Sequence, residues 1–303
     1  MAAPRTTPEK NGLLLLDKKP GLTSFESLRD LKKALGTSRV GHTGTLDKFA
    51  SGLLLVLAGR ALKLAPWFTR CRKDYEGTVR FGAETDTLDP EGAIVAEGPV
   101  PSREALEEAL RLFRGDILQA PPIYSAIHVE GRRASELARA GEAPEMKKRP
   151  VSVYSLELCS WEPPLASLRV RCSSGTYIRS LARDIALAAG SRAHLAGLRR
   201  TRVAGFSLED ASDSSGGVLL PIDGGVIGRL GLPRFETEPG VLDKMIRGRP
   251  LEPMLAGLRP LYPAGEQPAA EDFAAAVFSG GIFAGIVEKQ DGKWRYGYVY
   301  AYP

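Results

Sequence analysis

Cysteine and histidine are scarce in this chain of 303 residues, which has three of each. No two cysteines form a CxxC pair, so the sequence predicts neither a disulfide framework nor a thiolate zinc site. The histidines stand singly, without a carboxylate or thiol at the spacing of metal ligands. We therefore expect no bound metal. The residues concerned are Cys71, Cys159, Cys172, His42, His128 and His194.

Long apolar runs are also missing. No uninterrupted run approaches the roughly 20 residues that a membrane-spanning helix needs. The first twelve residues, MAAPRTTPEKNG, lack the apolar core of a signal peptide. No Rossmann or P-loop glycine pattern follows any expected strand. We expect a cytoplasmic protein that binds neither a membrane nor a cofactor.

Positive charge is in moderate excess, with a formal net charge of +5 and a pI of about 9.1. This balance suits a polyanionic partner without requiring one, because many soluble enzymes are mildly basic. Local clustering favours a nucleic acid, since five basic clusters on one face would form a binding surface. The clusters are Lys32-Lys33 with Arg39, Arg70-Arg72-Lys73, Arg132-Arg133, Lys147-Lys148-Arg149, and Arg199-Arg200-Arg202.

The periodicity of apolar residues predicts an α+β fold. Alternating or short apolar runs indicate strands, and spacings of three and four indicate helices, one of them opened by Thr176 and closed by Gly190. Long alternating strands with helices between them favour a mostly antiparallel mixed sheet flanked by helices over regular βαβ winding. We expect strands at 12–17, 73–82, 151–161 and 167–172, and helices at 24–35, 103–113 and 176–189.

Composition also predicts two domains. Small, acidic and glycine residues gather between 207 and 240, as is typical of connections. Beyond them lie short strand-like runs in which Asp291-Gly292 indicates a hairpin turn. We place a first domain at 1–235 and a small β-rich domain at 236–303.

The segment from Gly41 to Asp47, GHTGTLD, is the most informative in the chain. Its two glycines permit a tight backbone around a single carboxylate, which would hold Asp47 on a loop that faces a ligand. Taken alone, an aspartate after a glycine-rich loop is equally a turn former or a helix cap.

Five motifs in one order make the catalytic interpretation much more specific, because each motif alone is weak. They cover roughly residues 12–205, and the similarity continues through HLAGLRRTRVAGFSLEDA to LPID near Pro221. The motifs are DKKPGLTS, GHTGTLDKFASGLL, KDYEGTVRFGAETDTLDPEG, PPIYSAIHVEGRRASELAR and CSSGTYIRSLARDIA.

This set resembles the TruB family of tRNA pseudouridine-55 synthases. The resemblance implies an enzyme that isomerises uridine 55 in the T arm of tRNA by base flipping and a catalytic aspartate. It also implies a pseudouridine-synthase fold with a C-terminal domain similar to PUA modules. By resemblance we further expect a monomer without an obligate protein partner.

The resemblance assigns the catalytic roles to three residues. Asp47 would be the nucleophile or stabiliser when the glycosidic bond breaks, and Arg179 would pair with it. Tyr75 would pack on the target base and is a candidate for handling the C5 proton. Without the family match, Arg179 would suit a solvated helix face and Tyr75 ordinary strand packing. Whether Asp47 attacks C6 of uracil or C1′ of ribose stays open.

Substrate binding is assigned to further residues in the same way. Tyr177 and Leu198 match positions that line the uracil pocket, although both residue types are common in cores. His42 is the candidate to hold the vacated base stack, because imidazole stacks on bases without changing charge. Its alternative is a histidine satisfied by the backbone of its own loop.

Two departures from the family pattern stand out. Lys48 and Phe49 follow the aspartate where the family has proline and leucine, and His128 replaces a lysine expected near phosphate. Lys18 and Arg132 are the candidates to replace that contact.

Two other functions stay open. One is an RNA-binding or RNA-chaperone protein that has lost turnover, against which the intact set of Asp47, Tyr75 and Arg179 argues. The other is a related synthase that acts on a guide-RNA-selected or messenger-RNA uridine.

Overall fold

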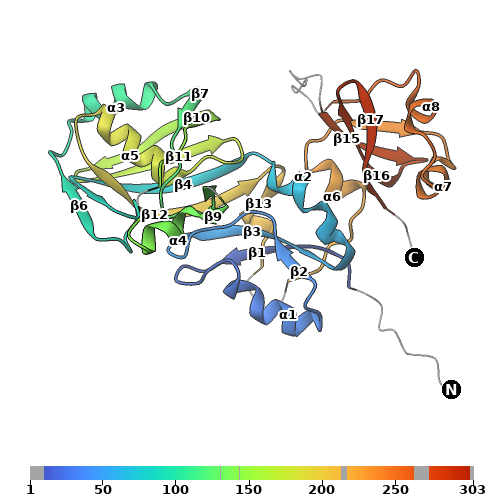
Figure 1. The fold of residues 1–303 in the computed structure, drawn as a ribbon, viewed down its shortest axis with the longest axis horizontal. Helices are drawn as coiled ribbons and strands as arrows, with labels where there is room; N and C mark the ends of the chain where they lie inside the picture. Colours follow the sequence, from blue (N-terminus) through green and yellow to red (C-terminus); the bar gives the residue numbers. More distant parts are fainter. Residues whose placement is uncertain (1–9, 130, 143, 213–216, 263–272, 301–303) are drawn as a thin grey trace.

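The computed structural model describes residues 10–129, 131–142, 144–212, 217–262 and 273–300. A nine-stranded mixed sheet forms the larger part (Figure 1). All its pairings are antiparallel except that of β12 with β3, which confirms the mostly antiparallel α+β fold. Its strands in spatial order are β1 (Gly12–Lys18), β3 (Ser51–Ala58), β12 (Ala193–Val203), β4 (Lys73–Phe81), β11 (Leu165–Cys172), β10 (Arg149–Glu162) and β7 (Gly115–Gln119), with β2 (Val40–His42) on β3 and β13 (Phe206–Ser207) on β12.

Sequence pattern explains the different strands. β4 alternates buried and more exposed residues along its length, as expected for a strand with one face on the core. β1 and β3 are leucine-rich and buried on both faces, because apolar clusters cover them from either side. The strands predicted at 12–17, 73–82, 151–161 and 167–172 are confirmed as β1, β4, β10 and β11.

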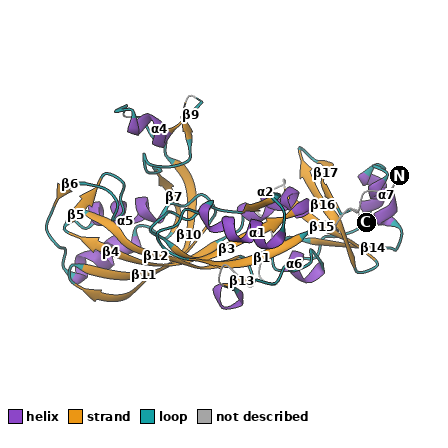
Figure 2. Ribbon diagram, turned by 90° about the horizontal axis from the view of Figure 1, so that it is seen from below, coloured by secondary structure: helices purple, strands orange, loops and turns teal. Residues whose placement is uncertain are grey.

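Helices cover the sheet on both faces (Figures 1 and 2). The predicted opening of the helix after CSSGT was wrong by one residue: Tyr177 is the N-cap and makes no side-chain capping bond. Thr176 instead lies 3.4 Å from the hydroxyl of Ser173. The helices are α1 (Arg29–Leu35), α2 (Ala65–Thr69), α3 (Arg103–Arg111), α4 (Ala134–Arg139), α5 (Ile178–Ala188), α6 (Gly224–Gly228), α7 (Val241–Ile246) and α8 (Leu251–Leu255).

A second, four-stranded sheet forms the C-terminal β-rich part, in the order β14 (Arg234–Thr237), β15 (Phe273–Ser279), β16 (Ile282–Gln290) and β17 (Lys293–Val299). Asp291 and Gly292, with φ of 49° and 75°, form the predicted turn between β16 and β17. The division between residues 235 and 236 stays a prediction.

One apolar cluster joins the two sheets. Leu13 and Leu55 of the large sheet share it with Phe278 and Ile286 of the small one, and Trp67 of α2 lies between them. A Cβ placed on Gly297 would come within 2.6 Å of the Trp67 ring, so the indole packs directly on β17. None of the helices in the described ranges is long and apolar enough to cross a membrane.

An arm leaves the large sheet between β7 and β10. It carries the short strands β8 (His128–Val129) and β9 (Arg132–Arg133) followed by α4, and it projects away from the sheet in the side view (Figure 2). The hairpin of β5 (Ala83–Thr85) and β6 (Ile94–Glu97) lies on the same side of the molecule as the arm and opposite the C-terminal sheet (Figure 2).

Candidate active site

Residues 43–50, the Asp47 loop, connect β2 to β3, and their backbone is held from three directions. The Ser24 hydroxyl donates to the Leu46 carbonyl (3.0 Å) and accepts from its N–H (2.9 Å). The Lys18 ammonium donates to the carbonyls of Ala50 (2.6 Å) and Lys48 (3.4 Å). The Arg200 guanidinium donates to the carbonyl of Gly44 at 3.0 Å. The loop is thus fixed although it lacks the family proline.

The side chain of Asp47 meets Arg179, as the resemblance implied. Arg179 Nη2 donates to Asp47 Oδ1 at 3.0 Å, and Nε lies 3.0 Å from Oδ2. The second contact is an ion pair without hydrogen-bond alignment, because Nε has no aligned acceptor. Arg179 is buried and Asp47 keeps 35% of its side chain exposed, so the carboxylate remains open to a ligand.

The pKa of Asp47 is raised above its ordinary value by burial, while the neighbouring Arg179 acts in the opposite direction. Arg179 favours the ionised form of Asp47, but burial has the larger effect on its pKa. Asp47 therefore takes up a proton at a higher pH than an ordinary aspartate.

Arg179 is itself positioned by partners that the sequence did not reveal. Its Nη1 donates to the Thr87 carbonyl (2.7 Å) and to Asp89 Oδ2 (3.2 Å), and Nη2 donates to the Tyr124 carbonyl (3.0 Å). Asp89 is buried. The segment TDTLDPEG belonged to a recognised motif, but nothing in its spacing indicated that Asp89 would reach a helix ninety residues further along the chain.

A pocket of about 550 Å³ opens above Asp47. The structure brings Tyr75, Tyr177 and Leu198 into its lining together with Asp47 and Arg179, as the resemblance implied. Tyr177 is locked at the start of α5, since its backbone N–H donates to Gln119 Oε1 (2.8 Å) and its carbonyl accepts from Gln119 Nε2 (3.1 Å).

Charge in this pocket is strongly one-sided. Asp47 is the single carboxylate among the described lining residues. Six cationic side chains accompany it, namely Arg70, Lys73, Arg133, Arg139, Arg179 and Arg200. Most of these cations are buried or already paired, but Arg133 and Arg139 are exposed and form no ion pair among the described residues. They present positive charge to a ligand, which suits a phosphate-bearing molecule.

Tyr75 is buried in β4 and its ring also belongs to the apolar core. Burial raises the pKa of its phenol, so the group is neutral around pH 7. The strand packing of Tyr75 is confirmed, and the residue also lines the Asp47 pocket. Its contact with the target base stays a prediction.

His42 lies at the end of β2, half-buried and outside the lining of the Asp47 pocket. Its Nδ1 has no hydrogen-bond partner in the described structure, so the loop backbone does not satisfy it as the alternative expected. Burial lowers the pKa of His42, with Arg200 acting in the same direction, and the ring is neutral at pH 7.

Lys18 was a candidate for contact with phosphate, and the structure contradicts this. Only 1% of the residue is exposed, and its ammonium donates to three backbone carbonyls. Burial also lowers the pKa of Lys18 to about 8. The side chain supports the Asp47 loop and does not reach the surface.

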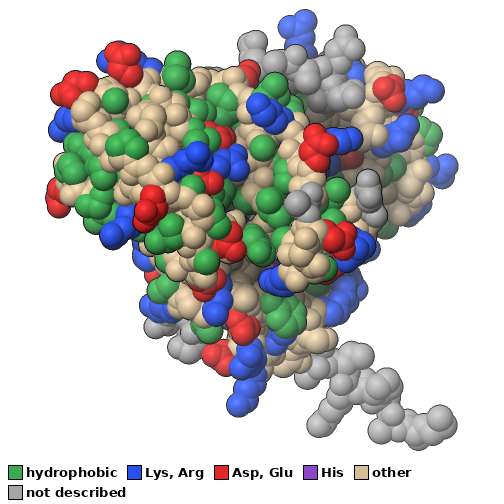
Figure 3. Space-filling view, turned by 60° about the vertical axis from the view of Figure 1, so that its left-hand side comes forward, with side chains coloured by type: hydrophobic (Ala, Val, Ile, Leu, Met, Phe, Trp, Pro, Cys, Tyr) green, Lys and Arg blue, Asp and Glu red, His purple; other side chains and the backbone are tan. Residues whose placement is uncertain are grey.

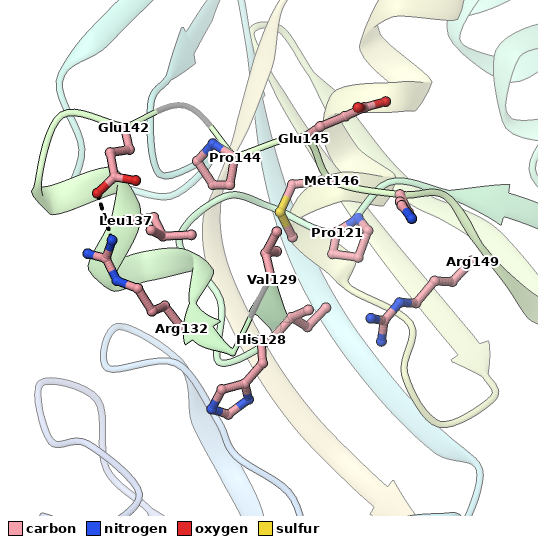
Figure 4. A pocket seen from close by; sticks show the side chains of 12 residues that line it. Pro121, His128, Val129, Arg132, Leu137, Glu142, Pro144, Glu145, Met146 and Arg149 are labelled. Atoms are coloured by element: carbon pink, nitrogen blue, oxygen red, sulfur yellow. Dashed lines mark hydrogen bonds and ion pairs between the residues drawn. The ribbon is translucent and has the colours of Figure 1, made fainter.

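Arg132 lies on the arm beside a separate pocket of about 540 Å³ (Figure 4). It pairs with Glu142 at 2.9 Å, and Val129 and Met146 point toward one another within this arm pocket. Arg132 is therefore not in the Asp47 pocket, where its neighbour Arg133 lies instead. The exposed His128 borders the arm pocket.

The basic clusters do not form one continuous surface on the face drawn in Figure 3, where Lys and Arg alternate with acidic side chains. Several of their members are occupied: Arg199 pairs with Asp17 at 3.1 Å and Arg70 with Glu288 at 3.7 Å. Positive charge is instead most concentrated inside the Asp47 pocket. Within the described ranges no group of three or more His, Cys, Asp or Glu side chains is placed to hold a metal ion.

Known proteins are similar to this chain in sequence and in fold. The family model described as TruB family pseudouridylate synthase (N terminal domain) matches residues 32–178. A tRNA pseudouridine synthase B of Borreliella burgdorferi is 48% identical over 206 residues, which is 67% of this chain and 73% of that protein. One from Aromatoleum aromaticum is 40% identical over 268 residues, or 84% and 86% of the two chains.

Solved structures agree on the fold. A Cbf5-Nop10-Gar1 complex contains a chain that superposes with a TM-score of 0.69 at 22% identity, covering 96% of this chain and 84% of that one. A pseudouridine-synthase fold in which a buried arginine pairs with a partly exposed aspartate defines the class of protein. This chain belongs to the TruB family of pseudouridylate synthases.

Proposed function

We propose that this chain isomerises uridine 55 in the T arm of tRNA to pseudouridine, with Asp47 as the catalytic carboxylate and with no metal or cofactor. The observation that carries the proposal is a partly exposed carboxylate, held by a buried arginine, at the base of a cationic pocket. Tyr75, Tyr177 and Leu198 line that pocket and provide apolar surface for a uracil ring.

The chemistry requires a nucleophile and a confined base. Asp47 adds either to C1′ of the ribose or to C6 of the uracil, and the N1–C1′ bond breaks. The base then rotates within the pocket and a C5–C1′ bond forms. The bond to Asp47 breaks, from C1′ as C5 attacks or from C6 by elimination, and the carboxylate is regenerated. The proton on C5 is lost and N1 gains one, so the reaction is redox-neutral. Tyr75, as a neutral phenol beside the base, is our candidate to pass on the C5 proton.

Transfer RNA as the substrate is supported by the relatives, which are named tRNA pseudouridine synthase B. The pocket supports it too, because the exposed cations Arg133 and Arg139 in its lining suit the phosphates around an extruded nucleotide. A base stacked in the T arm cannot reach Asp47, so the base must flip out. We assign to His42 the support of the vacated stack. We propose a cytoplasmic monomer that needs no partner protein.

A protein that binds RNA without turnover is the rival function. The contacts argue against it. Arg179 is buried and donates hydrogen bonds to both Asp47 and Asp89, an arrangement that simple RNA binding does not require.

Asp47→Asn tests the proposal directly. Purified wild type should convert the T-arm uridine of a tRNA transcript, whereas the variant should bind the same tRNA and form no pseudouridine. Asp30→Asn, at an exposed position on α1, is the matched control and should retain activity. Turnover by Asp47→Asn would refute the catalytic role, and pseudouridine at a different position would refute the assigned site.

A further inference from the structure

Arg200 occupies a central position in the large sheet. Its backbone lies opposite Tyr75 of β4 on one side and opposite Gly52 of β3 on the other. Residues directly opposite in an antiparallel pair carry their side chains on the same face. Arg200 and Tyr75 therefore share a face, and both line the Asp47 pocket.

The Arg200 guanidinium is almost completely buried, with 2% of the residue exposed. Its Nε donates to the Leu53 carbonyl (2.7 Å), Nη2 to the Gly44 carbonyl (3.0 Å) and Nη1 to the Thr45 carbonyl (3.4 Å). It forms no ion pair with a carboxylate in the described part of the chain. A buried charge of this kind is costly unless its donors are satisfied, and here the Asp47 loop and β3 satisfy them.

The phenol of Tyr75 lies near this guanidinium, because the two residues are direct neighbours on adjacent strands and line the same pocket. The charge of Arg200 lowers the pKa of Tyr75 against the larger, opposite effect of burial. One side chain is thus bonded to the loop that carries the carboxylate and lies beside the tyrosine on the same face of the sheet. Lys73 packs beside it, since a Cβ on Gly44 would lie 3.6 Å from both Lys73 Cε and Arg200 Nη1.

We propose that Arg200 is a positioning residue that fixes the Tyr75 ring relative to the Asp47 carboxylate. The inference rests on the proposed function, because the two groups must contact one uracil together. Arg179 orients the carboxylate from the α5 side of the pocket, and Arg200 holds the loop backbone and the tyrosine from the sheet side. Without Arg200, the Asp47 carboxylate and the Tyr75 ring are both still present, but they are no longer held in a fixed position relative to each other.

Single-turnover kinetics on saturating tRNA test this role, because the rate constant of the bound complex does not depend on how much enzyme is folded. Arg200→Gln and Arg200→Lys should lower that rate constant by about 100-fold, with little change in the Kd for tRNA. Arg200→Lys keeps the charge but cannot reproduce the three directed donors. Should Arg200→Gln fail to fold, Arg200→Lys decides the matter. Arg169→Gln, an exposed residue paired with Glu157 on the neighbouring strands, is the control.

A double-mutant cycle with Tyr75→Phe then separates positioning from support of the fold. If Arg200 acts through the tyrosine hydroxyl, Arg200→Lys should cost much less in the Tyr75→Phe background than in the wild type. Unchanged rate constants in both Arg200 variants, or strict additivity in the cycle, would overturn the inference. Absence of pseudouridine formation by the wild type would instead refute the proposed function.

Discussion

The carboxylates of Asp47 and Asp89 share one guanidinium, that of Arg179. Nη2 and Nε face Asp47, and Nη1 faces Asp89 at 3.2 Å. Asp89 is fixed in turn, because its Oδ1 accepts from the Thr87 hydroxyl at 2.6 Å and from the Glu91 N–H at 3.0 Å. Since a guanidinium is planar and its donors are rigidly spaced, the Asp89 contact sets the angle at which Arg179 meets Asp47.

Asp89→Asn should therefore slow catalysis, although residue 89 is not expected to contact the substrate. The amide cannot orient the guanidinium as an ionised carboxylate does, so we expect a decrease of about 10- to 100-fold in the single-turnover rate, with tRNA affinity retained. Asp116→Asn, at an exposed position on β7, should have no effect. A wild-type rate for Asp89→Asn would show that Asp47 and the backbone carbonyls orient Arg179 sufficiently.

The dependence of rate on pH follows from Asp47. Its pKa lies above the ordinary 3.8 because of burial, and catalysis needs the ionised form, so the rate should fall as the pH drops through this raised pKa. Arg179 lowers the pKa of Asp47, and Arg179→Gln should therefore move the acid limb to higher pH. Single-turnover rates between about pH 4 and 8 measure this. A limb at the same pH in both proteins would contradict the assignment to Asp47.

Salt dependence should distinguish cations that contact RNA from cations that are already paired. Arg133 and Arg139 line the Asp47 pocket and form no ion pair among the described residues, so replacing either with Ala should weaken tRNA binding. The slope of log K against log salt should become shallower by about 0.7 for each lost phosphate contact. Arg132→Ala should change it less, because Glu142 already pairs with Arg132. Equal slopes for all these proteins would mean that the pocket arginines do not bind phosphate.

Activity should persist in excess EDTA and without added nucleotide or reductant. The isomerisation is redox-neutral, and the proposed catalytic groups are side chains of this chain. The measurement is pseudouridine formation after prolonged chelation. Activity that is lost and then restored by zinc would contradict the prediction, and a tRNA folded beforehand in magnesium controls for the effect of chelation on the substrate.

Gly52 should tolerate no side chain. Its φ is +103°, and a Cβ there would lie 2.3 Å from the backbone oxygen of Arg200, in the parallel pairing that joins β3 to β12. We expect Gly52→Ala to destabilise the fold by about 2–4 kcal/mol. Gly248→Ala, also at positive φ but with no atom within 4 Å, should cost about 1 kcal/mol. Denaturant unfolding of both variants tests the difference.

Much of this fold was readable from local pattern, because the alternation in β4 and the helical stripe of α5 depend on neighbouring residues. Asp47 and Arg179 were found through motifs, and geometry has now placed them together. Asp89 and Arg200 were missed for a physical reason. Their roles depend on partners that are far apart in sequence, and a single charged side chain gives no periodic signal of its partner.

Lys18 was given a role that the structure contradicts. Lys18 was a candidate to replace the phosphate contact of the lysine that His128 substitutes, but whether a lysine ammonium points outward or inward depends on unsatisfied carbonyls nearby. The Asp47 loop supplies them at Lys48 and Ala50, so the charge turned inward. Composition could not distinguish the two positions.

The apolar cluster around Trp67 affects which lengths of RNA could contact both sheets at once. Because side chains of both sheets pack together within it, we expect the C-terminal sheet to keep its position relative to the large sheet when an RNA binds. The distance between Asp47 and β17 is then constant, and only an RNA long enough to cover that distance can contact both. A shortened RNA should therefore lose any contact with the C-terminal sheet completely, because the protein does not move to restore it.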